Sequence, residues 1–177
     1  MNKIANVYAG ALFEISFEEK KDGEILSQVK TLKTVFEENP QFIEVLAAPM
    51  ISKEEKLALI DNTFKGNVDG YVLNFIKVML ERKAVSLLTE SFEAFEEIYN
   101  KHYNIEKVVA TTAVELSMEL RKKLMDKLAA TTGKTILLEN RVDKDCLGGV
   151  VLKFSDTQLD DSIEQKLKAI KAELAKI

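Results

Sequence analysis

The sequence is poor in residues that break helices, cross-link chains or carry chemistry. Its 177 residues include two prolines, seven glycines, one cysteine, one histidine and no tryptophan. With so few helix breakers, long stretches can stay helical, and an α-rich fold is expected. The single cysteine, Cys146, cannot form a disulfide within the chain, which fits a reducing, cytoplasmic setting. No window holds the ~18 apolar residues of a membrane-spanning helix, so membrane association would be through partners.

Groups that could form an active site are equally scarce. Because His102 is the only histidine, a Ser–His–Asp triad or a metal site with two histidines is excluded within one chain. Cys146 lies in an acidic turn, which disfavours a reactive thiolate. Gly133-Lys134-Thr135 resembles the end of a phosphate-binding loop, but it follows a helix and is better explained as a helix C-cap. We therefore expect no catalytic residues, no metal and no cofactor.

Charge is distributed unevenly along the chain. Residues 1–105 carry 12 Lys/Arg and 17 Asp/Glu, a net charge of -5, whereas residues 106–177 carry 13 and 12, a net charge of +1. Nucleic-acid binding depends on basic surface, so the acidic first part argues against it.

Up to about residue 104 the apolar residues recur at helical spacing. Ser52 with Glu55 three residues later matches a capping box, and Asp22 is the expected N-cap of the second helix. Six helices are expected, at residues 3–18, 22–39, around 42–46, from 52 to 65, at 69–80 and at 85–103. Residues 1–105 are therefore predicted to form a six-helix bundle.

After Asn104 the pattern changes to β-branched runs separated by turns, as at a domain boundary. Residues 106–177 are predicted to form a small α/β domain. Its expected elements are a strand at 107–114, a helix from 117 to 133, strands at 135–142 and 149–154 paired as a hairpin, and a last helix from about 160 or 161. Asp143, Gly148 and Gly149 are assigned to the hairpin turn, because a tight turn needs positive φ or close backbone approach. The last helix would place Ile163, Leu167, Ile170 and Leu174 on one face.

The helices expected at 3–18 and 69–80 carry more apolar surface than one core-facing stripe needs. In the first helix two nearly opposite sides are apolar, one with Ile4, Tyr8, Ala11 and Ile15 and the other with Ala9, Phe13 and Phe17. In the helix at 69–80 the only polar stripe is Asn74, Lys77 and Glu81. A bundle of this size can surround about one helix completely. Either the helix at 69–80 is buried all round, or a groove between the two helices binds an amphipathic helix of a partner.

Two segments resemble the signature regions of the ATP synthase delta subunit family, the bacterial counterpart of the mitochondrial oligomycin-sensitivity-conferring protein. The first is Tyr8-Ala9-Gly10-Ala11-Leu12-Phe13. The second is Val142-Asp143-Lys144-Asp145-Cys146-Leu147-Gly148-Gly149-Val150-Val151, followed by Asp160-Asp161-Ser162-Ile163. The resemblance extends over essentially the whole chain, including its length and its order of a helical half and an α/β half.

The resemblance implies a non-catalytic peripheral-stalk (stator) subunit of the rotary proton-transporting ATP synthase, at the cytoplasmic face of the cell membrane. Residues 1–105 would bind N-terminal helices of alpha subunits in the groove between the first and fifth helices, and residues 106–177 would bind the b subunits. Neither nucleic acid nor a homo-oligomer would be needed, and the membrane would be reached only through the complex.

The resemblance and the helical faces together select the partner-binding residues. Tyr8, Ala11 and Leu12 match the first-helix pattern of the family, and Ala11 is small where a partner helix would approach closely. The helical faces add Ile4, Ile15, Phe75, Val78 and Met79. Ile163, Leu167, Ile170 and Leu174 are possible b-subunit contacts, although such a face is more often core.

Two other classes of function remain open from the sequence. A helical RNA-binding factor of the antitermination type has a similar size, but it would need a basic patch. An enzyme would have its best candidate in a phosphate site at Lys134.

Overall fold

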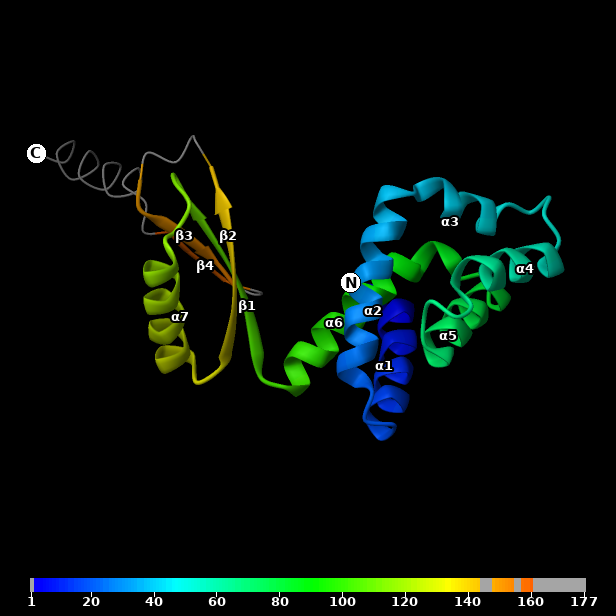
Figure 1. Ribbon diagram of the computed structural model, residues 1–177, viewed down its shortest axis with the longest axis horizontal. Coiled ribbons are helices and arrows are strands. Elements are labelled where there is room, and N and C mark those ends of the chain that lie inside the picture. The colour runs from blue at the N-terminus through cyan, green and yellow to red at the C-terminus, as the bar shows by residue number, and fades with distance from the viewer. Residues whose placement is uncertain (1, 144–147, 155–156, 161–177) are drawn as a thin grey trace, which may run out of the picture. The chain divides into compact units, whose positions relative to one another are not determined.

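The computed structural model of the chain describes residues 2–143, 148–154 and 157–160 (Figure 1). The chain divides into two compact units, Met1–Tyr99 and Asn100–Ile177. The described part is mainly helical and contains one small four-stranded sheet, so the expected mainly α fold with a small sheet is confirmed. Cys146 and the four candidates Ile163, Leu167, Ile170 and Leu174 lie outside the described residues.

The first unit consists of helices and is described on its own. The elements are α1 (Lys3–Glu18), α2 (Asp22–Glu38), α3 (Pro40–Ala47), α4 (Lys53–Phe64), α5 (Gly70–Glu81), the 3-10 turn η1 (Val85–Leu87) and α6 (Leu88–His102), whose last three residues belong to the second unit. Two predicted boundaries were wrong by a short distance. Asp22 is the first residue of α2, with Lys21 at the cap position, and α6 starts at Leu88 because residues 85–87 form the tighter 3-10 turn.

Local hydrogen bonds explain where several of these helices begin. The predicted capping box is confirmed: the backbone N–H of Glu55 donates to the Ser52 hydroxyl, and the N–H of Ser52 donates to the Glu55 carboxylate. At the start of α5, the Asp69 carboxylate accepts the N–H of Tyr71 at 2.9 Å. Pro40 begins α3, where its missing N–H costs no helical hydrogen bond.

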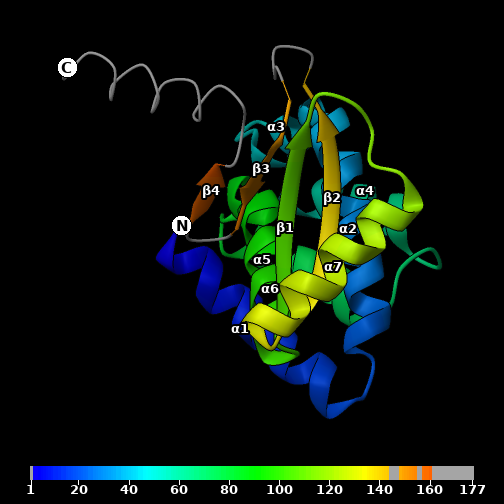
Figure 2. The ribbon, with the colours of Figure 1, turned by 90° about the vertical axis from the view of Figure 1, so that its left-hand side faces the viewer.

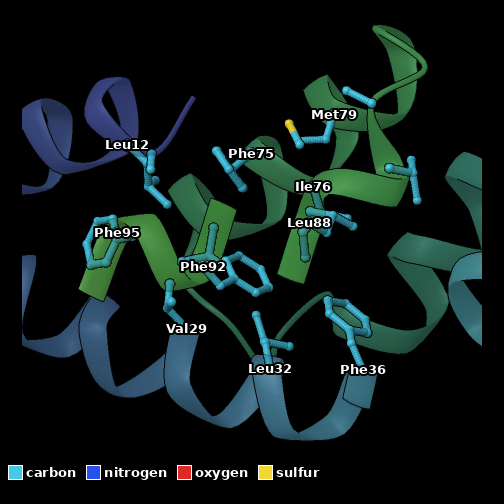
Figure 3. Close-up of a cluster of buried hydrophobic side chains, with 14 of the residues drawn as sticks. Leu12, Val29, Leu32, Phe36, Phe75, Ile76, Met79, Leu88, Phe92 and Phe95 are labelled. Carbon is cyan, nitrogen blue, oxygen red and sulfur yellow. The ribbon is translucent and has the colours of Figure 1, made fainter. Parts of the chain in front are cut away.

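One hydrophobic core joins the helices of the first unit. Figure 3 shows side chains from α1, α2, α5 and α6 converging on it, among them Leu12, Val29, Phe36, Phe75 and Phe92. The ring of Phe36 stacks on Phe92 with centroids 6.0 Å apart, and Phe92 lies 6.0 Å from Phe75. These aromatic contacts tie α2, α5 and α6 to a single centre.

The second unit contains the sheet and one described helix. Its elements are β1 (Ile105–Thr112), α7 (Met118–Thr132), β2 (Thr135–Val142), β3 (Val150–Lys153) and β4 (Gln158–Asp160). The strand order is β2-β1-β3-β4, with β1 parallel to β2 and antiparallel to β3. The predicted hairpin of β2 with β3 is therefore wrong, because β1 lies between them and pairs with both. As the central strand, β1 satisfies its backbone groups on two sides, which an edge strand cannot do.

Two further expectations for the second unit need correction. The first strand begins and ends two residues earlier than expected, and Val114 lies beyond it and is exposed. Asp160, expected at the start of the last helix, is instead the last residue of β4, a short strand that the sequence analysis missed.

Helix α7 covers one face of β1 and β2 (Figure 2). Beneath it, Val108, Ala110, Ile136 and Leu138 are buried. The helix ends at Gly133, whose φ of 68° is left-handed and whose N–H donates to the carbonyl of Ala129. The helix C-cap interpretation of Gly133-Lys134-Thr135 is thus confirmed.

Part of the segment between β2 and β3 lies within the described residues. Gly148 and Gly149 both have positive φ, at 139° and 87°. The N–H of Asp143 donates to the carbonyl of Thr112 at 2.9 Å, which continues the pairing of β2 with β1 by one residue. Glycine is favoured at such φ values because it has no Cβ.

Candidate docking surface on α1 and α5

Helices α1 and α5 contact each other, and an ion pair holds two of their ends together. Lys21 follows α1 closely, and its Nζ atom lies 2.9 Å from the Oδ2 atom of Asp69, which precedes α5. The same Nζ atom lies 5.8 Å from the centroid of the Tyr71 ring, within the range of a cation–π contact. The C-terminal end of α1 therefore lies beside the N-terminal end of α5.

The two apolar sides of α1 have different environments. The side with Ala9 and Phe13 is buried in the core, although Phe17 at its end is exposed. On the other side, Ile4 and Ile15 are 55% and 44% exposed, Ala11 is exposed and Tyr8 is half-buried. These four residues recur every three or four positions, so they form one continuous stripe along the helix. We call Ile4, Tyr8, Ala11 and Ile15 the α1 stripe.

Helix α5 is surrounded on most of its circumference. It contacts α1, α2, α4 and η1. Its buried residues are Val72, Phe75, Ile76, Met79 and Leu80. Tyr71, Lys77 and Val78 are half-buried, and Asn74 and Glu81 are exposed. Most of the apolar excess in α5 is thus explained by a central position in the core.

Three residues predicted to bind a partner are core residues instead. Leu12, Phe75 and Met79 are 3%, 8% and 0% exposed, respectively. Their apolar surface is already used within the unit, so they can support a docking surface from below but offer little contact area of their own. Of the eight predicted residues, the α1 stripe and Val78 retain accessible surface.

Sequence reasoning missed two features of this surface. Val7 is 68% exposed and extends the apolar surface of α1 beyond the stripe, as its helical position could have shown. The link between Lys21 and Asp69 joins residues 48 positions apart, which no local pattern reveals.

Fixed charges mark both ends of α5. The N–H of Tyr71 and the Lys21 ammonium group donate to Asp69 and lower the pKa of its carboxyl group, while Asp69 raises the pKa of Lys21. At the other end, Lys53 lies 2.9 Å from Glu81 and lowers the pKa of that carboxyl group. The N-cap Asp69 and the one acidic residue within α5, Glu81, are thus both charge-compensated within the unit.

The second unit exposes a smaller set of apolar side chains at one end of its parallel strands. Val142 lies opposite Thr112 at the carboxyl ends of β2 and β1, and it is exposed. Val114, in the segment that leads from β1 into α7, and Met118, the first residue of α7, are exposed as well. Among the described residues no group of three or more His, Cys, Asp or Glu side chains is placed to hold a metal ion.

Comparison with known proteins identifies the family to which this chain belongs. The family model of the ATP synthase delta (OSCP) subunit matches residues 4–174. The chain belongs to this family. It is 33% identical over 98% of its length to the ATP synthase subunit delta of Lachnoclostridium phytofermentans, covering 96% of that relative. It is 35% identical to the subunit delta of Leuconostoc citreum, covering 98% of this chain and 97% of that one.

A solved structure shows the same fold. A chain of the Toxoplasma gondii mitochondrial ATP synthase hexamer superposes with a TM-score of 0.74 at 18% identity, over 98% of both chains. The arrangement of helices and sheet described above therefore exists in an experimentally determined chain.

Family membership establishes the role of the chain. It is a structural stator subunit of an ATP synthase, with no enzymatic activity of its own, and it assembles with other subunits of that complex as a peripheral member. The RNA-binding and enzyme alternatives are not supported by these relatives. No helix among the described residues is long and apolar enough to cross a membrane.

Proposed function

We propose that the chain connects the catalytic head of the ATP synthase to its peripheral stalk, with one of the two predicted domains for each connection. Residues 1–105, as a six-helix bundle, bind the N-terminal helix of an alpha subunit. Residues 106–177 bind the b subunits, with Ile163, Leu167, Ile170 and Leu174 as possible contacts. The complex lies at the cytoplasmic face of the cell membrane and couples proton flow to ATP synthesis.

The observation that carries this proposal is the exposed α1 stripe, on a helix that contacts the largely enclosed α5. Isolated exposed apolar residues are ordinary on protein surfaces. Here Ile4, Tyr8, Ala11 and Ile15 line one side of a single helix over three turns. Val78 of the contacting helix α5 is half-buried. An apolar stripe of this period is the complement of an amphipathic helix that presents its own apolar face.

The α1 stripe is large enough to contribute to affinity, provided that the partner helix has a complementary shape. Burying an isoleucine completely is worth about 1.5–3 kcal/mol, so covering the roughly half-exposed Ile4 and Ile15 contributes about 2 kcal/mol together. Ala11 lies between them and has no side chain beyond Cβ, which lets a partner backbone approach closely. The affinity therefore depends on close packing at Ala11.

Ala11→Asp tests the docking site. A buried unpaired carboxylate on the approach path should weaken binding of a synthetic peptide of the alpha-subunit N-terminus by about 2 kcal/mol, or roughly thirtyfold. Fluorescence anisotropy of the labelled peptide with the full chain measures this. Ala58→Asp is the matched control, because Ala58 is an exposed alanine within α4. Equal affinity of a folded Ala11→Asp variant and the wild-type chain would refute the site.

The connection through the second unit needs its own experiment. We expect the full chain to co-purify with the b subunits, and a variant with Ile163 and Ile170 both changed to Asp to lose them while retaining the alpha-subunit peptide. Retention of the b subunits by a folded double variant would show that Ile163 and Ile170 are not the contacts. The exposed Val114, Met118 and Val142 would then be the next residues to test.

A further inference from the structure

Two glutamates border the α1 stripe on one side. At about 100° per residue, Glu14 and Glu18 follow Ala11 around the helix, on the flank opposite the buried Leu12. Both side chains are exposed, and neither forms an ion pair with any described residue. The outer margin of the stripe is thus acidic.

The placement of these glutamates is unfavourable for the free chain. They are four residues apart, so their like charges face each other on adjacent turns. Glu18 is also the last residue of α1, Glu19 is its C-cap, and the last turn contains no basic residue. Negative charge at a helix C-terminus opposes the helix dipole. The nearby Lys21 pairs with Asp69, and Lys20 forms no ion pair among the described residues.

The acids around α5 behave differently. Asp69 pairs with Lys21, Glu81 with Lys53, and Asp61 of α4 with Lys77 at 2.6 Å. One side of the proposed docking surface is therefore neutralised within the unit, whereas the α1 side keeps its negative charge. A departure from local helix rules without compensation inside the chain is characteristic of a binding surface.

We propose that the helix that docks on the α1 stripe carries Lys or Arg residues along the margin that faces Glu14 and Glu18. This inference rests on the proposed docking function and specifies the chemistry of the partner. Apolar contact supplies most of the affinity, and the ion pairs set how the partner helix is rotated. Because Glu14 and Glu18 lie in the C-terminal half of α1, the basic residues lie on the part of the partner that covers Ile15.

The double variant Glu14→Gln/Glu18→Gln of the full chain tests the inference. The probe is the synthetic peptide of the alpha-subunit N-terminus, measured at low and at physiological ionic strength. Neutralising two partly exposed pairs should weaken binding about fivefold at low ionic strength. It should also flatten the dependence on salt, since screening acts on those pairs.

A matched control separates a local contact from a general effect of charge. Glu38→Gln/Glu44→Gln makes the same change of net charge at two exposed glutamates of α2 and α3, neither of which pairs with a cation in the described part of the chain. This control should bind as the wild-type chain does. Free Glu14→Gln/Glu18→Gln should melt about 2 °C higher than the wild-type chain, because the like-charge and dipole penalties are removed.

The possible outcomes distinguish the two proposals. If Ala11→Asp weakens binding as expected while Glu14→Gln/Glu18→Gln matches its control, the docking site stands and the basic margin is refuted. If the wild-type chain does not bind the peptide at all, both proposals fail. The basic margin is supported by two results together. Glu14→Gln/Glu18→Gln binds the peptide more weakly than its control does, and a peptide whose Lys and Arg are changed to Gln binds without the salt dependence.

Discussion

Replacing Asp69 tests how the adjoining ends of α1 and α5 are held together. Its Oδ1 atom accepts the N–H of Tyr71 at 2.9 Å, its Oδ2 atom accepts from Lys21 at 2.9 Å, and its own N–H donates to the Gln28 side chain at 2.7 Å. Asp69→Ala removes the cap, worth about 1 kcal/mol, and a partly exposed ion pair, worth about 0.5 kcal/mol. Asp69→Asn keeps a capping side chain and should lose only about 0.5 kcal/mol.

The pH dependence of these variants follows from the lowered pKa of Asp69. The two donors hold the pKa of the carboxyl group below its ordinary value of 3.8. A lowered pKa in the folded state means that the stabilisation is fully present above pH 3.8 and is lost as the pH falls through the folded-state pKa. The stability gap between the wild-type chain and Asp69→Asn should therefore be largest near neutral pH and close in acid.

Urea unfolding followed by helical circular dichroism measures both effects. Lys21→Met combined with Asp69→Asn completes a double-mutant cycle, in which the coupling free energy should equal the loss seen in Asp69→Asn alone. Equal stability of Asp69→Ala and Asp69→Asn would remove the capping role. A gap between the wild-type chain and Asp69→Asn that widens in acid would contradict the ion pair.

Two further predictions concern the stability of the separate units. Gly133→Ala should destabilise the second unit by about 1 kcal/mol; the cost comes from the φ of 68° alone, because an added Cβ would meet no atom within 4 Å. Gly133→Asn should lower the melting temperature less, since Asn tolerates the left-handed conformation better than Ala does. Equal melting temperatures of the wild-type chain and both variants would refute the left-handed cap. Phe92→Ala should lower the free energy of unfolding in urea by about 4 kcal/mol, since the ring is buried between Phe36 and Phe75. Phe17→Ala, at an exposed ring, is the control and should lower it far less. Similar losses in the two variants would contradict the central place of Phe92 in the core.

Features decided by neighbouring residues were predictable from the sequence. The capping box at Ser52 and Glu55 and the C-cap at Gly133 each depend on groups within four residues, and both are present. Helix boundaries in the first unit were close for the same reason.

Pairing between distant segments was not predictable in the same way. A hairpin was predicted from two strand-like segments that follow each other in sequence, residues 135–142 and 149–154. In the structure β1 pairs with each of them instead. Nothing local to either segment reveals that pairing. The short β4 was missed because three residues carry too little pattern.

The candidate docking surface was likewise predictable in its local pattern but not in its tertiary environment. Helical periodicity revealed that α1 has two apolar sides, but only tertiary packing decides that Ala9 and Phe13 face the core while Ile4 and Ile15 remain exposed. For the same reason Leu12, Phe75 and Met79, which share helices with exposed residues, are used in the core.

The central claim is that the chain holds the catalytic head to the stalk, and proton pumping in reconstituted vesicles tests it most directly. ATP synthase lacking this subunit should hydrolyse ATP without acidifying the vesicle interior, and addition of the full chain should restore pumping. Ala11→Asp should restore far less than Ala58→Asp at the same concentration. Full coupling without the chain, or equal restoration by both variants, would contradict the account.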